Sequence, residues 1–130
     1  GRIDSRISYC GELTNQQIVQ EEKKATLLIN PRPPVGEWTA FSFPSKNMEY
    51  IASGTPMLAY KLPCIPVEYL QHFFYPANTD FACVLEEAIK LDRSELHKMG
   101  IEAQRWIVQN KNSEIQTKKA VEMFNRLKRK

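Results

Sequence analysis

Short apolar runs alternate with helical periods along the first half of the chain. Residues 25–30 (ATLLIN) form a continuous apolar run, which is typical of a strand buried on both faces of a parallel sheet. Residues 56–60 (PMLAY) have the same character. Residues 6–10 (RISYC) alternate in polarity and residues 73–75 form a last short apolar stretch, so each is also expected to be a strand.

Helical signals separate these strands. Thr14 is a good N-cap for a helix over Asn15–Lys24. A second helix is expected over Ser45–Ser53, with Ser45 as its cap and Gly54 in the left-handed position that ends it.

From Asp80 onward the pattern is helical. Asp80 is expected to cap the first of these helices and Ser113 the last. Four apolar positions of the last helix are expected to face the interior: Ala120, Val121, Phe124 and Leu127. The order of elements predicts an α/β fold, with a Rossmann-like parallel sheet, helices on both of its faces and a helical C-terminal tail. Residues 1–130 are expected to form a single domain.

Composition excludes several classes of protein. The chain is 42% hydrophobic and 25% charged, which argues against disorder and fibrous repeats. Its net charge of +3 is mild for a nucleic-acid binder, so no nucleic-acid partner is expected. No apolar run approaches the roughly 20 residues of a membrane span. We therefore expect a cytoplasmic protein, whose basic C-terminal tail either touches the inner membrane face or is a plain solvated helix end.

Metal chemistry is not expected. The three cysteines, Cys10, Cys64 and Cys83, are widely spaced and form no CxxC pair, and His72 and His97 are the only histidines. This pattern favours buried or free thiols over a zinc site or a disulfide scaffold. His72 is expected to be a core or rim residue.

Residues 31–44 connect the strand at 25–30 to the helix at Ser45–Ser53. Four prolines and Gly36 exclude a helix interior or a central strand here. A long loop with aromatic residues after a buried strand is more often functional than decorative. Ligands of parallel α/β sheets bind beyond the carboxyl ends of strands, where loops lead into helices. The pattern therefore predicts a site at this loop.

The helix that begins at Ser45 offers chemistry for an anion. Its first backbone N–H groups have no partner within the helix, and its dipole is positive at that end. Lys46 adds a positive charge, and Glu49 lies one turn on, where its carboxylate can accept hydrogen bonds from a vicinal diol. These groups suit a nucleotide diphosphate. The same spacing also fits an ordinary helix start with a solvated face, and the chain has neither a P-loop nor a GxGxxG motif.

Residues 43–56 (FPSKNMEYIASGTP) resemble the nucleotide-binding helix of retaining glycosyltransferases of family 4, which have two Rossmann-like domains in the GT-B architecture. The motif is similar to the PSK–x–x–EY–x–A–x–G–x–P branch of that family. Residues 7–13 (ISYCGEL), 25–32 (ATLLINPR) and 56–69 are similar to the flanking strands and loops, so the resemblance covers roughly residues 7–127. The chain is identified as a C-terminal nucleotide-sugar-binding domain that is incomplete at its N-terminus.

The resemblance implies roles for individual residues. Glu49 would hold the ribose hydroxyls, and the backbone N–H groups of Ser45 and Lys46 would hold the diphosphate. Leu13 would lie against the base. The loop from Arg32 onward would face the transferred sugar, with Arg32 in the nucleotide-sugar site.

The chain also departs from the family pattern. Many members carry two glutamates separated by seven residues; the second matches Glu49, but the first falls at Phe41. A carboxylate contact to the sugar would then come from Glu37 or be absent, with Phe43 as a further candidate contact. The basic residues that clamp the diphosphate in this family lie on an earlier loop, and the chain is expected to begin after it.

The implied function is transfer of a sugar, with retention, from a nucleoside diphosphate sugar to a glycan or lipid-linked acceptor. This is a hexosyltransferase reaction of polysaccharide biosynthesis, in which electrostatic stabilisation of the leaving diphosphate needs neither cofactor nor metal. The acceptor would bind through a missing N-terminal domain, so the chain alone is expected to be inactive. The incomplete sheet favours self-association. The alternatives are a non-catalytic nucleotide-binding module and a flavodoxin-like interaction module.

Overall fold

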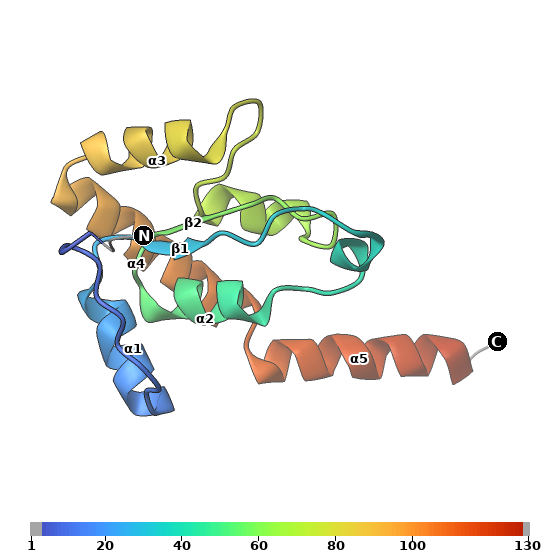
Figure 1. Ribbon diagram of the computed structural model, residues 1–130. Coiled ribbons are helices and arrows are strands. Elements are labelled where there is room, and N and C mark those ends of the chain that lie inside the picture. The colour runs from blue at the N-terminus through green and yellow to red at the C-terminus, as the bar shows by residue number, and fades with distance from the viewer. Residues whose placement is uncertain (1–3, 129–130) are drawn as a thin grey trace.

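The computed structural model describes residues 4–128 and has a mixed α/β fold (Figure 1). Two short strands alternate with the first two α-helices, and three further helices follow. The elements in chain order are α1 (Asn15–Lys24), β1 (Leu28–Asn30), the 3-10 helix η1 (Glu37–Ala40), α2 (Ser45–Ser53), β2 (Met57–Ala59), the 3-10 helix η2 (Val67–His72), α3 (Phe81–Lys90), α4 (Arg93–Asn110) and α5 (Ser113–Lys128).

The two strands form a small parallel sheet. Leu28 pairs with Met57, and Asn30 pairs with Ala59. On the other side of β2, Phe74 makes a single parallel bridge, in which its N–H donates to the Met57 carbonyl at 2.9 Å. β2 is therefore the central element of the sheet, and all three of its residues are buried.

The core lies where β2, α2, α4 and η2 meet. Ile51 of α2 packs with Met57 of β2 and with Ala103 and Ile107 of α4. α4 approaches the end of α2 so closely that a Cβ at Gly100 would collide with the carbonyl of Gly54. The helix pair α2–α4 thus packs with β2 to form the interior, and the start of α2 lies at one side of this core.

The structure confirms the limits of the first two helices. Thr14 forms a capping box with Gln17: the Thr14 N–H donates to the Gln17 side-chain oxygen at 2.9 Å, and the Gln17 N–H donates to the Thr14 hydroxyl at 3.4 Å. Gly54 ends α2 in the left-handed region, with φ of 82°. Asp80 caps α3 by accepting from the Cys83 N–H at 2.8 Å. Local capping chemistry was therefore a reliable guide to these helix ends.

Two predicted caps were wrong by one residue. Ser45 is the first residue of α2, and the N-cap position is taken by Pro44, which has no side-chain hydrogen bond to offer. The cap of α5 is Asn112, whose side-chain oxygen accepts from the Ile115 N–H at 2.9 Å, so Ser113 is already helical. In both helices, the residue before the serine remains outside the helix and occupies the cap position.

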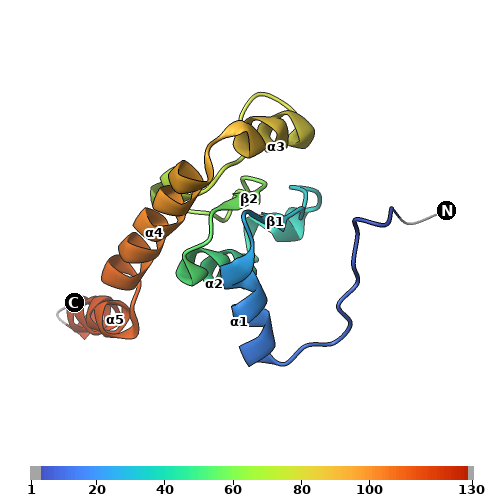
Figure 2. The same cartoon turned by 90° about the vertical axis from the view of Figure 1, so that its left-hand side faces the viewer.

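The expected strand at residues 6–10 is not formed. Ile7 is 67% exposed and Tyr9 is 93% exposed, and Figure 2 shows this stretch standing apart from β1. A strand needs a neighbour for its backbone hydrogen bonds, and within residues 4–128 none lies beside this segment. β1 is shorter than expected, and its Ile29 is 40% exposed, so burial on both faces was also wrong. The expected strand at 73–75 is reduced to the bridge at Phe74.

The last helix, α5, does not face the interior as expected. No residue of α5 is buried, and Val121, Phe124 and Leu127 are 51%, 58% and 63% exposed. Figure 1 shows α5 leaving the end of α4 and extending out beyond the rest of the molecule. The apolar stripe was predicted correctly as a stripe, but no described element lies opposite it.

Candidate functional site

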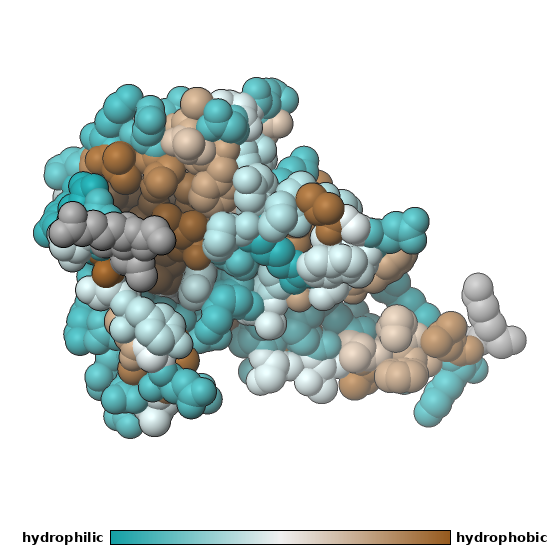
Figure 3. Space-filling model, viewed as in Figure 1, coloured by the Kyte–Doolittle hydropathy of each residue, from teal (hydrophilic) through white to brown (hydrophobic). Residues whose placement is uncertain are grey.

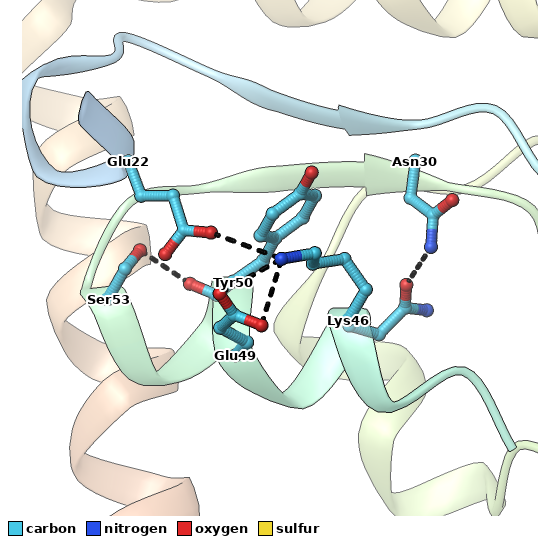
Figure 4. A network of polar contacts seen from close by, with 7 residues as sticks. Glu22, Asn30, Lys46, Glu49, Tyr50 and Ser53 are labelled. Carbon is cyan, nitrogen blue, oxygen red and sulfur yellow. Dashed lines mark hydrogen bonds and ion pairs between the residues drawn. The ribbon is translucent and has the colours of Figure 1, made fainter. Parts of the chain in front are cut away.

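The carboxyl end of β1 is joined directly to the first turn of α2. The Asn30 side-chain amide donates to the Asn47 side-chain oxygen at 2.6 Å, and Asn47 is only 3% exposed (Figure 4). Asn30 is the last residue of the strand, and Asn47 lies in the first turn of the helix. This bond holds the helix start beside the strand end, which is the position where parallel α/β sheets bind ligands.

The start of α2 leaves backbone donors open. The Asn47 N–H donates to the Pro44 carbonyl at 2.9 Å, but Pro44 provides no side-chain cap. Within residues 4–128 no side chain accepts a hydrogen bond from the N–H of Ser45 or Lys46. Ser45 is exposed. Two amides and the positive end of the helix dipole therefore remain available to an anion from solvent.

Lys46 and Glu49 form an ion pair one turn into this helix. The Lys46 ammonium donates to both carboxylate oxygens of Glu49, at 3.0 and 2.9 Å. This pair raises the pKa of Lys46, since the carboxylate stabilises the ammonium. Both side chains remain partly exposed, at 44% and 41%. In Figure 4 the ammonium is directed toward the carboxylates of Glu49 and Glu22.

Glu22 of α1 completes a three-residue charged cluster with Lys46 and Glu49. Its side chain is 6% exposed, and its nearer oxygen lies 3.9 Å from the Lys46 ammonium (Figure 4). Neither carboxylate oxygen has a hydrogen-bond partner within residues 4–128. Burial raises the pKa of Glu22, and the nearby negative charge of Glu49 raises it further. The cluster therefore holds two carboxyl groups around one ammonium, and an ionised Glu22 leaves it with an excess negative charge.

Sequence reasoning missed Glu22 as a site residue. Its one signal is its position a turn after Ile18 on the inward side of an amphipathic helix, where a carboxylate is unusual. Beside the cluster lies a hollow of about 220 Å³, whose wall includes Glu22, Glu49 and Ser53. The cluster thus borders a space that a small polar group can enter.

Arg32 organises the loop that precedes α2. Its guanidinium lies over the Trp38 ring at 4.3 Å and donates to the Ser42 carbonyl at 3.3 Å. Its Nε atom is buried and has no partner within residues 4–128. Trp38 is 55% exposed, and Glu37 begins η1 as an exposed residue. The contacts of Arg32 therefore stabilise the loop, and its Nε–H has no acceptor within residues 4–128.

The structure does not bring every predicted residue to the helix start. Phe43 packs against Tyr69, with ring centroids 5.5 Å apart, at the border of the hydrophobic core. Leu13 lines a separate shallow hollow with Cys10 and Gln17, and no residue of α2 or of the loop at 31–44 lines it. Ser45, Lys46 and Glu49 share α2. The binding roles predicted for these three residues, and those predicted for Leu13, Glu37 and Phe43, stay predictions.

His72 has the packed surroundings expected of a rim residue. Its ring stacks on Trp106, with centroids 4.1 Å apart, and its buried Nε2 has no partner among the described residues. Burial lowers the pKa of His72. It lines a second hollow of about 340 Å³ together with Met57 and Ala103, which are core residues.

Within residues 4–128 no group of three His, Cys, Asp or Glu side chains is placed to hold a metal ion. None of the described helices is long and apolar enough to cross a membrane. Comparisons of the chain with protein-family models, curated proteins and solved structures find no match.

Proposed function

We propose that this chain is the donor-binding domain of a retaining glycosyltransferase, and that a nucleoside diphosphate sugar binds at α2. The proposal rests on the open start of α2, where the amides of Ser45 and Lys46 have no hydrogen-bond partner within residues 4–128 and the Lys46–Glu49 ion pair lies on the same helix. This segment is also the one whose sequence resembles the nucleotide-binding helix of family 4. On this proposal the two strands are part of a Rossmann-like sheet with helices on both faces.

Donor binding would rearrange the Lys46–Glu49 pair. The diphosphate would accept from the amides of Ser45 and Lys46, and the Lys46 ammonium would turn toward it. Glu49 would then be free to accept from the ribose hydroxyls. The exchange is inexpensive, because a partly exposed pair of this spacing is worth only about 0.3–0.5 kcal/mol. A charge-assisted contact to a phosphate is stronger than the pair it replaces.

Sugar transfer would use the same electrostatics. The positive helix end and Lys46 would stabilise the diphosphate as the glycosidic bond breaks, without a cofactor or a metal. Arg32 would add its unused donor once the sugar reaches the loop. The acceptor, a glycan or a lipid-linked sugar, would bind through a second domain, so this chain alone is expected to bind donor without transferring it.

Isothermal titration calorimetry of the chain with UDP, GDP and ADP tests this proposal. We expect one of the three to bind, and we expect Glu49→Gln to weaken it roughly 10- to 100-fold, since hydrogen bonds to a charged group contribute about 1.5–3 kcal/mol. Glu102→Gln is the matched control, because Glu102 is exposed on α4. Absence of heat with all three diphosphates, or equal effects of the two substitutions, would contradict the proposal.

A non-catalytic nucleotide-binding module is the second candidate. Phe41 stands where many family members carry a glutamate, and its ring is 89% exposed in the loop. It cannot accept a hydrogen bond from a sugar. Equal affinity for a nucleoside diphosphate and its sugar conjugates would favour this alternative, whereas tighter binding of one conjugate would favour the transferase.

A further inference from the structure

The outer face of α5 is apolar and uncovered. Ala120, Val121, Phe124 and Leu127 recur at spacings of one to four residues, and Met123 adds to the same side of the helix. Their exposure is high: Val121 is 51%, Met123 55%, Phe124 58% and Leu127 63% exposed. Figure 3 shows these brown side chains gathered on the projecting part of α5. An exposed apolar surface of this kind marks a site that contacts a membrane or another protein.

The excess positive charge of the chain is concentrated in the same segment. Residues 113–130 contain six of the chain's 18 Lys and Arg residues and only two of its 15 Asp and Glu residues. The remaining residues, 1–112, therefore contain 12 basic and 13 acidic side chains, which nearly cancel. The segment that ends the chain carries +4 by itself, although the whole chain carries +3.

The basic side chains flank the apolar stripe. Projected at 100° per residue, Lys119 and Arg126 fall beside one border of the stripe and Lys118 beside the other. Lys118 is paired with Glu114 at 2.9 Å in the first turns. Lys128 falls within the stripe, between Phe124 and Val121, where a long stem can run along an apolar surface while its ammonium stays in water. An apolar stripe with basic borders is the pattern of a helix that lies in the plane of a membrane surface.

We propose that α5 lies flat on an anionic lipid surface, with Phe124 and Leu127 in the acyl boundary and Lys119 and Arg126 over lipid phosphates. The net charge of α5 favours a lipid surface over a second copy of the chain as the partner of the apolar stripe. α5 itself has four basic and two acidic residues, so two α5 helices packed face to face would bring together two segments of +2, whereas an anionic bilayer would neutralise them. This placement does not depend on the donor site, because it uses no residue of α2.

Vesicle sedimentation of the full chain tests the proposal. We expect the chain to bind vesicles of phosphatidylcholine with 30% phosphatidylglycerol at least tenfold more tightly than pure phosphatidylcholine, an order-of-magnitude value for several basic residues near such a surface. Binding is expected to weaken as salt rises, because salt screens exposed charges.

Matched variants separate charge from general surface effects. Lys119→Gln and Arg126→Gln are each expected to weaken binding about fivefold, since one basic residue near an anionic surface contributes about 1 kcal/mol. Lys98→Gln removes the same charge from α4 and is expected to have no effect. Phe124→Ser keeps the charge, removes one apolar anchor, and is expected to weaken binding about tenfold or more.

Two results would overturn the proposal. One is the absence of binding to the anionic vesicles by the unmodified chain. The other is a self-associated chain that Phe124→Ser converts to monomer while vesicle binding stays unchanged, which would assign the stripe to a second copy. Circular dichroism of each variant checks that the fold persists, and no change is expected because no residue of α5 is buried.

Discussion

α2 and α5 are both amphipathic helices, yet they end in opposite environments. Ile51 of α2 is 2% exposed and lies in the core, whereas Phe124 of α5 is 58% exposed. α2 is held between the two strands and α4, and α5 extends beyond the end of α4. Helical periodicity therefore predicts which side of a helix is apolar, but not whether the rest of the chain covers that side.

The largest expected effect separates the two helices by stability. Ile51→Ala should lower the free energy of unfolding by about 3 kcal/mol, because it empties a fully buried position. Leu127→Ala in α5 should change it by less than about 0.5 kcal/mol, because the side chain is exposed. Urea denaturation of both variants measures the difference. Equal losses would mean that α5 packs against the body of the molecule.

A second effect concerns the close approach of α4 to the end of α2. Gly100→Ala should destabilise the chain by about 1–3 kcal/mol, because the added methyl group meets the Gly54 carbonyl, which is backbone and cannot rotate away. Thermal unfolding checks this value. Ala120→Gly on α5 is the contrasting change, and it should cost only the helix propensity of about 1 kcal/mol or less. A neutral Gly100→Ala would show that the two helices lie farther apart.

The charged cluster beside α2 predicts a gain in stability. Glu22→Gln should stabilise the chain by about 1 kcal/mol at pH 7, because it replaces by a neutral amide a buried carboxylate that has no hydrogen-bond partner within residues 4–128. Burial raises the pKa of Glu22, so the folded chain keeps this proton to higher pH than the unfolded chain. Stability should therefore fall as pH rises from the ordinary value of 4.5 through the raised pKa.

Denaturation curves of the parent chain and Glu22→Gln across pH 4 to 8 measure this dependence, and the variant should lose the decline. Glu114→Gln on α5 is the control, because that carboxylate is 77% exposed. A loss of stability in Glu22→Gln at pH 7 would show instead that the ionised carboxylate supports Lys46.

The smallest expected effect is acid sensitivity at His72. Burial lowers the pKa of His72, so the unfolded chain takes up this proton at higher pH than the folded chain. Stability should therefore decline as pH falls from its ordinary value of 6.5 through the lowered pKa. His72→Phe keeps an aromatic ring on Trp106 and should reduce that decline, as thermal melting at pH 7.5 and pH 5 would measure. An unchanged pH dependence would assign the decline to other groups.

Local signals in the sequence predicted much of the fold. The capping box at Thr14 and the left-handed Gly54 identify the ends of α1 and α2, because these features depend on a few adjacent residues. The expected strand at residues 6–10 failed because pairing depends on a distant neighbour that composition does not reveal. The apolar stripe of α5 was predicted because its spacing depends only on nearby residues. Its exposure could not be predicted, because exposure depends on which other elements cover the helix.

The candidate site was predicted only in part, for a related reason. Ser45, Lys46 and Glu49 lie on one helix, so their spacing brings them together without any tertiary information. Glu22 joins them from another helix, and the Asn30–Asn47 bond joins a strand end to the first turn of α2. Contacts of this kind follow from packing, and no motif in the sequence encodes them.

Backbone amide NMR during a titration with UDP, GDP or ADP tests whether a nucleotide binds at the start of α2. We expect the N–H signals of Ser45 and Lys46 to shift in a saturable manner with one of the three diphosphates, while signals of α5 stay in place. The Glu49→Gln variant should need roughly 10 to 100 times more ligand for the same shift. Saturation with no movement at Ser45 and Lys46, or movement centred on the basic residues of α5, would contradict a nucleotide site at the start of α2.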